Sequence, residues 1–330
     1  MPAPKIFKDP SQQKLFNKQG FVVMPSFLKQ SEIEHMDALF DELHPNLPQN
    51  GFFAGVYSSD FSYKEKVKNE VKRVYQRAYE TVFENYTSFG GAFLFKSSAP
   101  DSDLFVHQDW TVVDEEKEVA LNIWIPLCDM TLENGPLMVL PGSHYDAFKT
   151  LRAPTMRFFF DNDPNFIIDQ LEPLIVKAGD AVILNQSLVH YSPPNVSGKI
   201  RKAITAGIKT KNAQMIFHYK DQNSNAIEKF EMDDDFFIQF DDFFKDIYQR
   251  PKVGKSIGTI NYTVPMVTGN ALVDVVRTMK TNAGFNFKEP IVASVSDSNS
   301  VSKVTKKKTP LWKTYSPLNV FNEIKVRLKK

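Results

Sequence analysis

The first ninety residues show the spacing of amphipathic helices. Ser31 and Glu34 have the spacing of a capping box, in which each side chain bonds to the other's free backbone amide. Apolar positions three and four residues apart follow: Ile33, Met36, Leu39, Phe40 and Leu43. We therefore expect a helix here to about His44, ended by Pro45. Residues 61–86 repeat apolar positions at the same spacing between Lys, Arg and Glu, which predicts a long helix with one buried face.

From about residue 90 to residue 220 the pattern changes to short apolar runs separated by turn residues. The runs are rich in Val, Ile, Phe and Thr, and clusters of Gly, Pro, Asn and Asp lie between them. They predict strands at Ala92–Phe95, Leu104–His107, Val119–Leu127, Leu137–Leu140, Leu171–Lys177, Ala181–Leu184, Lys202–Lys209 and Met215–Tyr219. Many short strands between turns are typical of a double-stranded β-helix, or jelly roll. We expect a mainly β fold with flanking helices outside this core.

Beyond Tyr219 the spacing is again helical. A stripe of apolar residues follows three aspartates that suit the positive end of a helix dipole: Phe236, Phe240, Phe243, Phe244 and Ile247 after Asp233, Asp234 and Asp235. We expect this stripe to pack on the β core rather than to bind a ligand. Residues 1–290 are thus predicted to form one domain, with 291–310 as a Ser- and Lys-rich linker and 311–330 as a basic tail.

The bulk composition excludes several classes of protein. Hydrophobic residues make up 42% and charged residues 24% of the 330, the balance of an ordinary globular protein. The formal net charge is only +1, so nucleic acid is not an expected partner. The N-terminus lacks the apolar core of a signal peptide, and no run reaches the roughly 18 apolar residues of a transmembrane segment. We expect a cytoplasmic location.

Two further features concern the tail and the single cysteine. From Lys303 to residue 330 there are nine Lys and Arg residues and one acidic residue, with apolar residues between them. This tail either contacts an anionic membrane surface or a protein weakly, or docks loosely on its own domain. Cys128 is the only cysteine, which excludes an intramolecular disulfide and favours a reducing compartment. It follows an apolar run, where a buried and unreactive thiol is expected.

The first candidate for chemistry is the triplet His107-Gln108-Asp109. Residues two apart on a strand point to the same face, so a nitrogen and a carboxylate ligand from this triplet can meet one ion. A His and an Asp on the surface are the alternative interpretation of such a short motif.

The second candidate begins at His190, just before a turn rich in Pro, Asn and Gly. If the arms on either side of the turn pair as antiparallel strands, His190 lies opposite Arg201. A metal ligand and a guanidinium would then share one cavity. Iron(II) oxygenases require two His and one carboxylate on one face of the ion, with the other positions open. The planar fork of an Arg can hold a carboxylate by two charge-assisted hydrogen bonds.

Together these residues resemble the phytanoyl-CoA dioxygenase family of 2-oxoglutarate oxygenases. The resemblance covers about residues 90–210 and rests on an ordered series of motifs: His107-Gln108-Asp109, Asn122-Ile123-Trp124-Ile125-Pro126-Leu127, Glu133-Asn134-Gly135-Pro136-Leu137-Met138-Val139-Leu140-Pro141-Gly142-Ser143-His144, Gly179-Asp180, His190 and Arg201.

The resemblance implies a jelly-roll core and a set of site residues. It makes His107, Asp109 and His190 the iron ligands and catalytic centre, and Arg201 the anchor for the far carboxylate of 2-oxoglutarate. It places Ser192 and Trp124 against this co-substrate, and Asn122 shares a strand face with Trp124. The implied function is an Fe(II)-dependent dioxygenase that uses O2 and 2-oxoglutarate to hydroxylate a small organic molecule, releasing succinate and CO2.

Alternatives to this interpretation remain open at this point. Taken singly, Trp124 has the alternative of a core residue, Ser192 that of a turn cap and Arg201 that of a surface strand residue. For the whole chain the alternative is a non-catalytic jelly-roll binding protein, in which the barrel holds a ligand and the histidines are incidental. The same oxidant also serves desaturation, cyclisation, epimerisation and protein hydroxylation. Asp109 argues against halogenation, because related halogenases replace this carboxylate with a small residue. Candidate substrate contacts lie beside the proposed ligands and after the first long helix: Gln108, Trp110, Tyr191, Phe52 and Phe53. The other histidines are expected to be structural.

Overall fold

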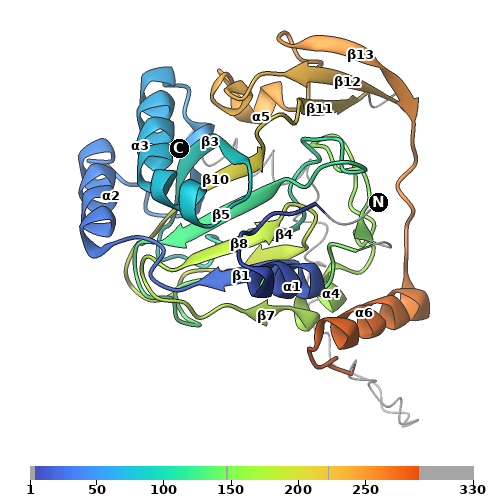
Figure 1. The fold of residues 1–330 in the computed structure, drawn as a ribbon, viewed down its shortest axis with the longest axis horizontal. Helices are drawn as coiled ribbons and strands as arrows, with labels where there is room; N and C mark the ends of the chain where they lie inside the picture. Colours follow the sequence, from blue (N-terminus) through green and yellow to red (C-terminus); the bar gives the residue numbers. More distant parts are fainter. Residues whose placement is uncertain (1–3, 146–147, 222, 290–330) are drawn as a thin grey trace, which may run out of the picture.

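The computed structural model describes residues 4–145, 148–221 and 223–289. Its centre consists of two antiparallel sheets with helices outside them (Figure 1). The larger sheet has the strand order β1-β8-β5-β10-β3-β2, with bounds Phe21–Met24, Ala181–Asn185, Leu121–Pro126, Arg201–Thr210, Tyr86–Lys96 and Phe52–Ala54. The smaller sheet has the order β4-β9-β6-β7, with bounds Leu104–His107, His190–Ser192, Met138–Val139 and Glu172–Pro173. The predicted fold class, mainly β with flanking helices, is confirmed.

Alternation along the strands decides which side chains meet between the two sheets. Leu121, Ile123 and Ile125 of β5 are fully buried in the cluster under the helices. Trp124 packs in a different cluster, which includes Val139 of the smaller sheet. The predicted split of this strand into two faces is therefore confirmed, and its inner face looks into the space between the sheets.

The helices α2 (Gln30–Leu43) and α3 (Phe61–Thr81) cover the outer face of the larger sheet (Figure 1). The predicted capping box of Ser31 and Glu34 is wrong. The helix begins earlier, after the extended Lys29, so that Glu32 is the residue whose carboxylate accepts the backbone N–H of Lys29, at 2.7 Å.

The helix α3 ends earlier than predicted, at Thr81 rather than residue 86, because the chain enters β3 at Tyr86. It also lies very close to that strand. A Cβ on Gly91 would lie 3.0 Å from the Cα of Lys68, and Gly91 has a φ of +145°. Only glycine fits this approach without strain.

Two strands in the N-terminal region were missed. β1 and β2 lie in a region whose spacing predicted mainly helix, and they extend the two edges of the larger sheet by pairing with β8 and β3. Their partners are distant in sequence, so no local pattern marks them. The remaining elements of this half are α1 (Pro10–Gln19) and a 3-10 turn, η1 (Gly55–Tyr57).

The predicted helix beyond Tyr219 is also wrong. A third sheet forms here from β11, β12 and β13, with bounds Met215–Lys220, Ala226–Met232 and Lys255–Asn261. The apolar stripe divides between a 3-10 turn, η3 (Phe236–Ile238), and a short helix, α5 (Phe243–Asp246). The carboxylate of Asp246 accepts the backbone N–H groups of Asp241 and Asp242, at 3.1 and 3.0 Å, which turns the chain between the two pieces.

Two more helices complete the described chain. α4 (Pro164–Gln170) and α6 (Gly269–Ala283) pack beside the smaller sheet, where Leu272 and Val276 of α6 join a cluster with Val106 and Phe160. The predicted linker 291–310 and basic tail 311–330 lie outside the described residues. Within the described part of the chain, no helix is long and apolar enough to cross a membrane.

Candidate active site

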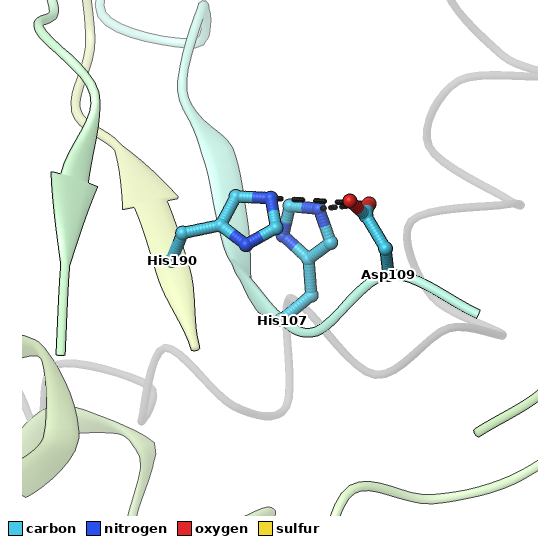
Figure 2. Close-up of side chains that lie close together, drawn as sticks. All are labelled: His107, Asp109 and His190. Carbon is cyan, nitrogen blue, oxygen red and sulfur yellow. Dashed lines mark ion pairs between the residues drawn. The ribbon is translucent and has the colours of Figure 1, made fainter. Parts of the chain in front are cut away.

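The structure brings the three predicted ligands together between the two sheets (Figure 2). β4 pairs with β9 so that His107 and His190 are direct partners, with ring centroids 4.1 Å apart. Asp109 follows β4 and turns toward both rings. Its Oδ1 lies 4.0 Å from Nε2 of His107 and 3.9 Å from Nε2 of His190. One ligand atom from each residue lies within 4.8 Å of the others, so the group is compact enough for one ion.

Backbone carbonyls fix the tautomer of both imidazoles. Nδ1 of His107 lies 2.7 Å from the carbonyl oxygen of Phe105, and Nδ1 of His190 lies 2.9 Å from that of Leu188. Since a carbonyl only accepts, each Nδ1 carries a proton, which leaves Nε2 of each ring as the atom that can bind a metal. Burial, and then the neighbouring His190, lowers the pKa of His107 to about 3. This imidazole is therefore neutral at pH 7, the form that binds metal.

Asp109 is oriented from the larger sheet. The amide of Asn122 donates to Oδ2 of Asp109 at 3.2 Å, which leaves Oδ1 facing the histidines. The hydroxyl of Thr205 donates in turn to the Asn122 carbonyl oxygen at 2.5 Å. Asn122 therefore orients the carboxylate of Asp109. Its predicted contact with the co-substrate remains a prediction. Thr205 was missed, although it lies four residues after Arg201 and so on the same strand face.

The predicted pairing of His190 with Arg201 is wrong. His190 lies in the smaller sheet, opposite His107 and Val139, whereas Arg201 begins β10 in the larger sheet, opposite Lys96. The turn between them carries the chain from one sheet to the other instead of forming a hairpin. The two side chains nevertheless line the same cavity, as predicted, from facing walls.

Arg201 is buried with donors that lack partners. Its side chain is 2% exposed, and one Nη donates to the Ser192 hydroxyl at 3.3 Å. Nε and the other Nη have no hydrogen-bond partner among the described residues. Burial lowers the pKa of the guanidinium to about 10, so the group is charged at pH 7. A buried donor left unsatisfied costs about 1–3 kcal/mol, more when charged, and a bound carboxylate would remove that cost.

Two neighbours shape the space in front of this guanidinium. Ser192 donates its hydroxyl to the carbonyl oxygen of Gly135 at 2.9 Å, which leaves its oxygen free to accept from Arg201. The Trp124 ring lies 5.7 Å from the guanidinium carbon and is 5% exposed. Both line the cavity, so the predicted co-substrate residues are assembled on one side of it.

The cavity has a volume of about 950 Å³ and extends outward from the three proposed ligands. Four of the five predicted substrate contacts line it: Phe52, Phe53, Gln108 and Trp110. The Gln108 amide, however, already donates to the carbonyl oxygens of Phe148 and Ser187 and so anchors the loop before His190.

Tyr191 is the exception among these five. Since His190 and Ser192 face inward on β9, strand alternation turns Tyr191 to the other side, where it packs against the cluster around Leu140. It does not line the cavity, and its prediction as a substrate contact is wrong.

The outer part of the cavity comes from residues that the sequence did not indicate as a binding surface. Phe237, Phe243, Phe244 and Tyr248 all line it. The expectation that this apolar stripe only packs is correct for Phe236 and Phe240, which are buried and do not line the cavity. It is wrong for Phe243 and Phe244, which are half-buried, and for the buried Ile247, because all three line the cavity. The run of phenylalanines in this segment is the feature of the sequence that could have indicated a binding surface.

The remaining histidines and the cysteine lie away from the three proposed ligands. Each of the four histidines contacts a protein group: His35 with Glu70, His44 with Tyr63, His144 with the Asn17 carbonyl and His218 with the Thr111 carbonyl. Burial raises the pKa of the half-buried Cys128 thiol, as expected for an unreactive side chain.

Comparisons with known proteins point to one family. The family model of phytanoyl-CoA dioxygenase (PhyH) matches residues 16–203. Phytanoyl-CoA dioxygenase 1 of Oryza sativa subsp. japonica is 30% identical over 115 residues, which cover 34% of this chain and 41% of that protein. Phytanoyl-CoA dioxygenase of Arabidopsis thaliana is 23% identical over 243 residues, covering 59% and 86%.

A Dictyostelium discoideum homologue, phytanoyl-CoA dioxygenase domain-containing protein 1, is 32% identical over 129 residues, covering 35% of this chain and 44% of that protein. The chain thus spans less than half the length of the first of these curated relatives. Among solved structures, the non-heme alpha ketoglutarate dependent carbocyclase SnoK from nogalamycin biosynthesis gives a TM-score of 0.48 at 20% identity. The alignment covers 63% of this chain and 86% of SnoK.

Proposed function

Since the chain belongs to the phytanoyl-CoA dioxygenase family of 2-oxoglutarate-dependent iron dioxygenases, we propose that it hydroxylates a small organic molecule with release of succinate and CO2. His107, Asp109 and His190 hold Fe(II) in this proposal, and Arg201 binds the far carboxylate of 2-oxoglutarate. The observation that carries it is the pair of histidine Nε2 atoms facing one carboxylate, across a cavity from a buried guanidinium with unpartnered donors.

The donor set fits the proposed metal. Two neutral imidazoles and one carboxylate are the ligands of non-haem Fe(II) oxygenases, and they leave positions open for co-substrate and O2. Bound Fe(II) would activate O2 for attack on a C–H bond, with 2-oxoglutarate supplying two electrons as it is converted to succinate and CO2. The chain's own part is to hold the imidazoles in one tautomer, keep Oδ1 of Asp109 turned inward and surround the reaction with apolar walls that exclude water.

Anaerobic spectroscopy tests the assignment directly. We expect the purified chain to bind one Fe(II), and 2-oxoglutarate added without O2 to produce a weak visible charge-transfer band, because the proposed triad leaves positions open for chelation. Admission of O2 should then yield succinate. A folded, iron-loaded sample that shows neither the band nor succinate would indicate a non-catalytic binding protein instead.

Replacing Asn122 tests the support of the carboxylate. In Asn122→Ala, Asp109 loses the amide that fixes Oδ2, and we expect Fe(II) affinity to fall by about 10- to 100-fold, as for other groups that orient metal ligands. Metal titration measures the effect. Asn162→Ala, at an exposed position, is the matched control and should bind Fe(II) as the wild type does. An unchanged affinity in Asn122→Ala would show that Asp109 needs no such support.

The mass of the product identifies the reaction. Hydroxylation adds one oxygen atom to the substrate, whereas desaturation or cyclisation removes two hydrogen atoms. Mass spectrometry of the converted substrate therefore distinguishes the proposed hydroxylation from the other reactions that the same oxidant can perform.

A further inference from the structure

Five of the aromatic side chains that line the cavity are here called the aromatic wall: Tyr57, Trp110, Phe237, Phe243 and Phe244. The Trp110 ring stacks on Phe237 and Phe243, with centroids 5.7 and 6.1 Å apart and planes tilted by only 25° and 11°. The ring centroids of Tyr57 and Phe244 are 4.5 Å apart. Trp110 directly follows the proposed ligand Asp109, so the wall extends from the proposed iron site outward.

The wall is held in place by lysines from α3 and β10. Nζ of the buried Lys64 donates to the Phe240 carbonyl oxygen at 2.5 Å, between the two pieces of the wall. Lys68 and Lys209 pair with Asp235 and Asp234, at 2.8 and 3.1 Å. These contacts fix the segment together with the packing of Phe237 and Phe243 on the buried cluster around Phe236. The rings are therefore a built surface rather than a loose loop.

Three of the five wall residues lie outside the part of the chain that the family model matches. That match ends at residue 203, whereas Phe237, Phe243 and Phe244 come from the connection between β12 and β13. The proposed iron ligands and Arg201 all lie within the match. The proposed iron site thus lies wholly within the match, whereas three of the five wall residues come from a part of the chain beyond it, as expected for a substrate surface specific to this chain.

The charges around this cavity disfavour an anion. Among the described residues that line it, Arg201 is the one Lys or Arg, and it lies 2% exposed in the inner part. Asp101 and Asp103 also line the cavity. The connection between β12 and β13 carries six aspartates, of which Asp234 and Asp235 are paired with Lys209 and Lys68. A phosphate-bearing substrate would therefore meet no Lys or Arg other than the buried Arg201 among the described residues that line the cavity.

On the basis of the proposed function, we infer that the aromatic wall binds a large, uncharged, ring-bearing molecule and that the substrate is not a coenzyme A thioester. The volume of about 950 Å³ is at the upper end of the roughly 300–1,000 Å³ found for small-molecule sites. Flat apolar rings gain most from stacked aromatic side chains. The phosphates of coenzyme A require cations that the described cavity does not provide outside the buried Arg201.

Binding of Nile red, an uncharged fused-ring dye, tests the wall. The chain is loaded with Fe(II) and 2-oxoglutarate without O2, and dye fluorescence is titrated. We expect saturable binding at one site, weakened about three- to tenfold in Phe243→Ala and in Phe244→Ala through lost stacking. Phe61→Ala, on α3 outside the cavity and 50% exposed, is the matched control and should bind like the wild type. If Phe243→Ala does not fold, Phe243→Leu keeps most of the apolar volume and should still weaken binding.

A matched pair of competitors tests whether the cavity disfavours a negatively charged ligand. Methyl decanoate and decanoyl-coenzyme A carry the same acyl chain, and both are used below their micelle concentrations against bound Nile red. We expect the thioester to displace the dye at least about ten times less effectively. Equal or better displacement by the thioester, or dye binding that all wall variants leave unchanged, would overturn the inference. The anaerobic band of the wild type reports separately on the iron site, so its presence would leave the proposed function standing.

Discussion

Asp109→Ala is expected to abolish both Fe(II) binding and turnover. This substitution removes the only carboxylate of the proposed triad and leaves two imidazoles, whose Nε2 atoms lie 4.0 and 3.9 Å from the lost Oδ1. Groups that merely orient a ligand contribute about 10- to 100-fold to metal affinity, so loss of the ligand itself should exceed about a hundredfold. Metal analysis after gel filtration measures the first effect and succinate release the second.

The control for this experiment is a nearby, half-buried aspartate at the surface. Asp114 pairs with Lys117 at the surface, at 2.7 Å, and does not line the cavity. Asp114→Ala should retain Fe(II) and turnover. Full iron stoichiometry in a folded Asp109→Ala protein would show that the metal is held elsewhere and would remove the basis for the proposed reaction.

Arg201→Ala is expected to raise the KM for 2-oxoglutarate by at least about tenfold and to leave iron stoichiometry unchanged. The guanidinium is buried with two donors unpartnered, so a bound carboxylate would be its main partner. Truncating one member of a buried charge pair costs about 2–5 kcal/mol, which corresponds to roughly 30-fold to several thousandfold in affinity. Initial rates of succinate formation against 2-oxoglutarate concentration measure the change.

Two further variants define what the guanidinium contributes. Arg201→Lys keeps the charge but loses the planar fork, so its KM should fall between those of the wild type and Arg201→Ala. Arg250→Ala removes an exposed Arg that pairs with Glu228 and should have no effect. If Arg201→Ala depended on 2-oxoglutarate as the wild type does, the co-substrate would have to be anchored by another residue.

Several features of the site could be predicted because they depend on local geometry. His107 ends β4 and Asp109 lies two residues further on, beyond the strand, and their side chains meet on one side, as the strand spacing predicted. The same rule places Asn122 and Trp124 on the inner face of β5 and leaves Ile123 under the helices. The ordered motifs around these residues also indicated the family, which the match to residues 16–203 confirms.

Predictions that required the partner of a strand were less successful. The turn after His190 has the composition of a hairpin, yet its arms belong to different sheets. Turn residues specify that the chain reverses, whereas the choice between pairing with the neighbouring arm and crossing to another sheet depends on distant strands. For the same reason β1 and β2 were not predicted, since each is stabilised by a strand far away in sequence.

The sequence by itself therefore determined the class of fold, the family and the identity of the proposed iron ligands, since alternation and motif order are properties of neighbouring residues. Only the tertiary structure decided what these residues face. It paired His107 with His190 through β4 and β9, and it set Arg201 on the opposite wall. It also divided the Phe-rich stripe into two short elements, turning Phe243 toward the cavity while Phe236 stayed in the core. Helical periodicity could not show this, because the aspartates between the two pieces interrupt the helix and so rotate the later rings onto a different face.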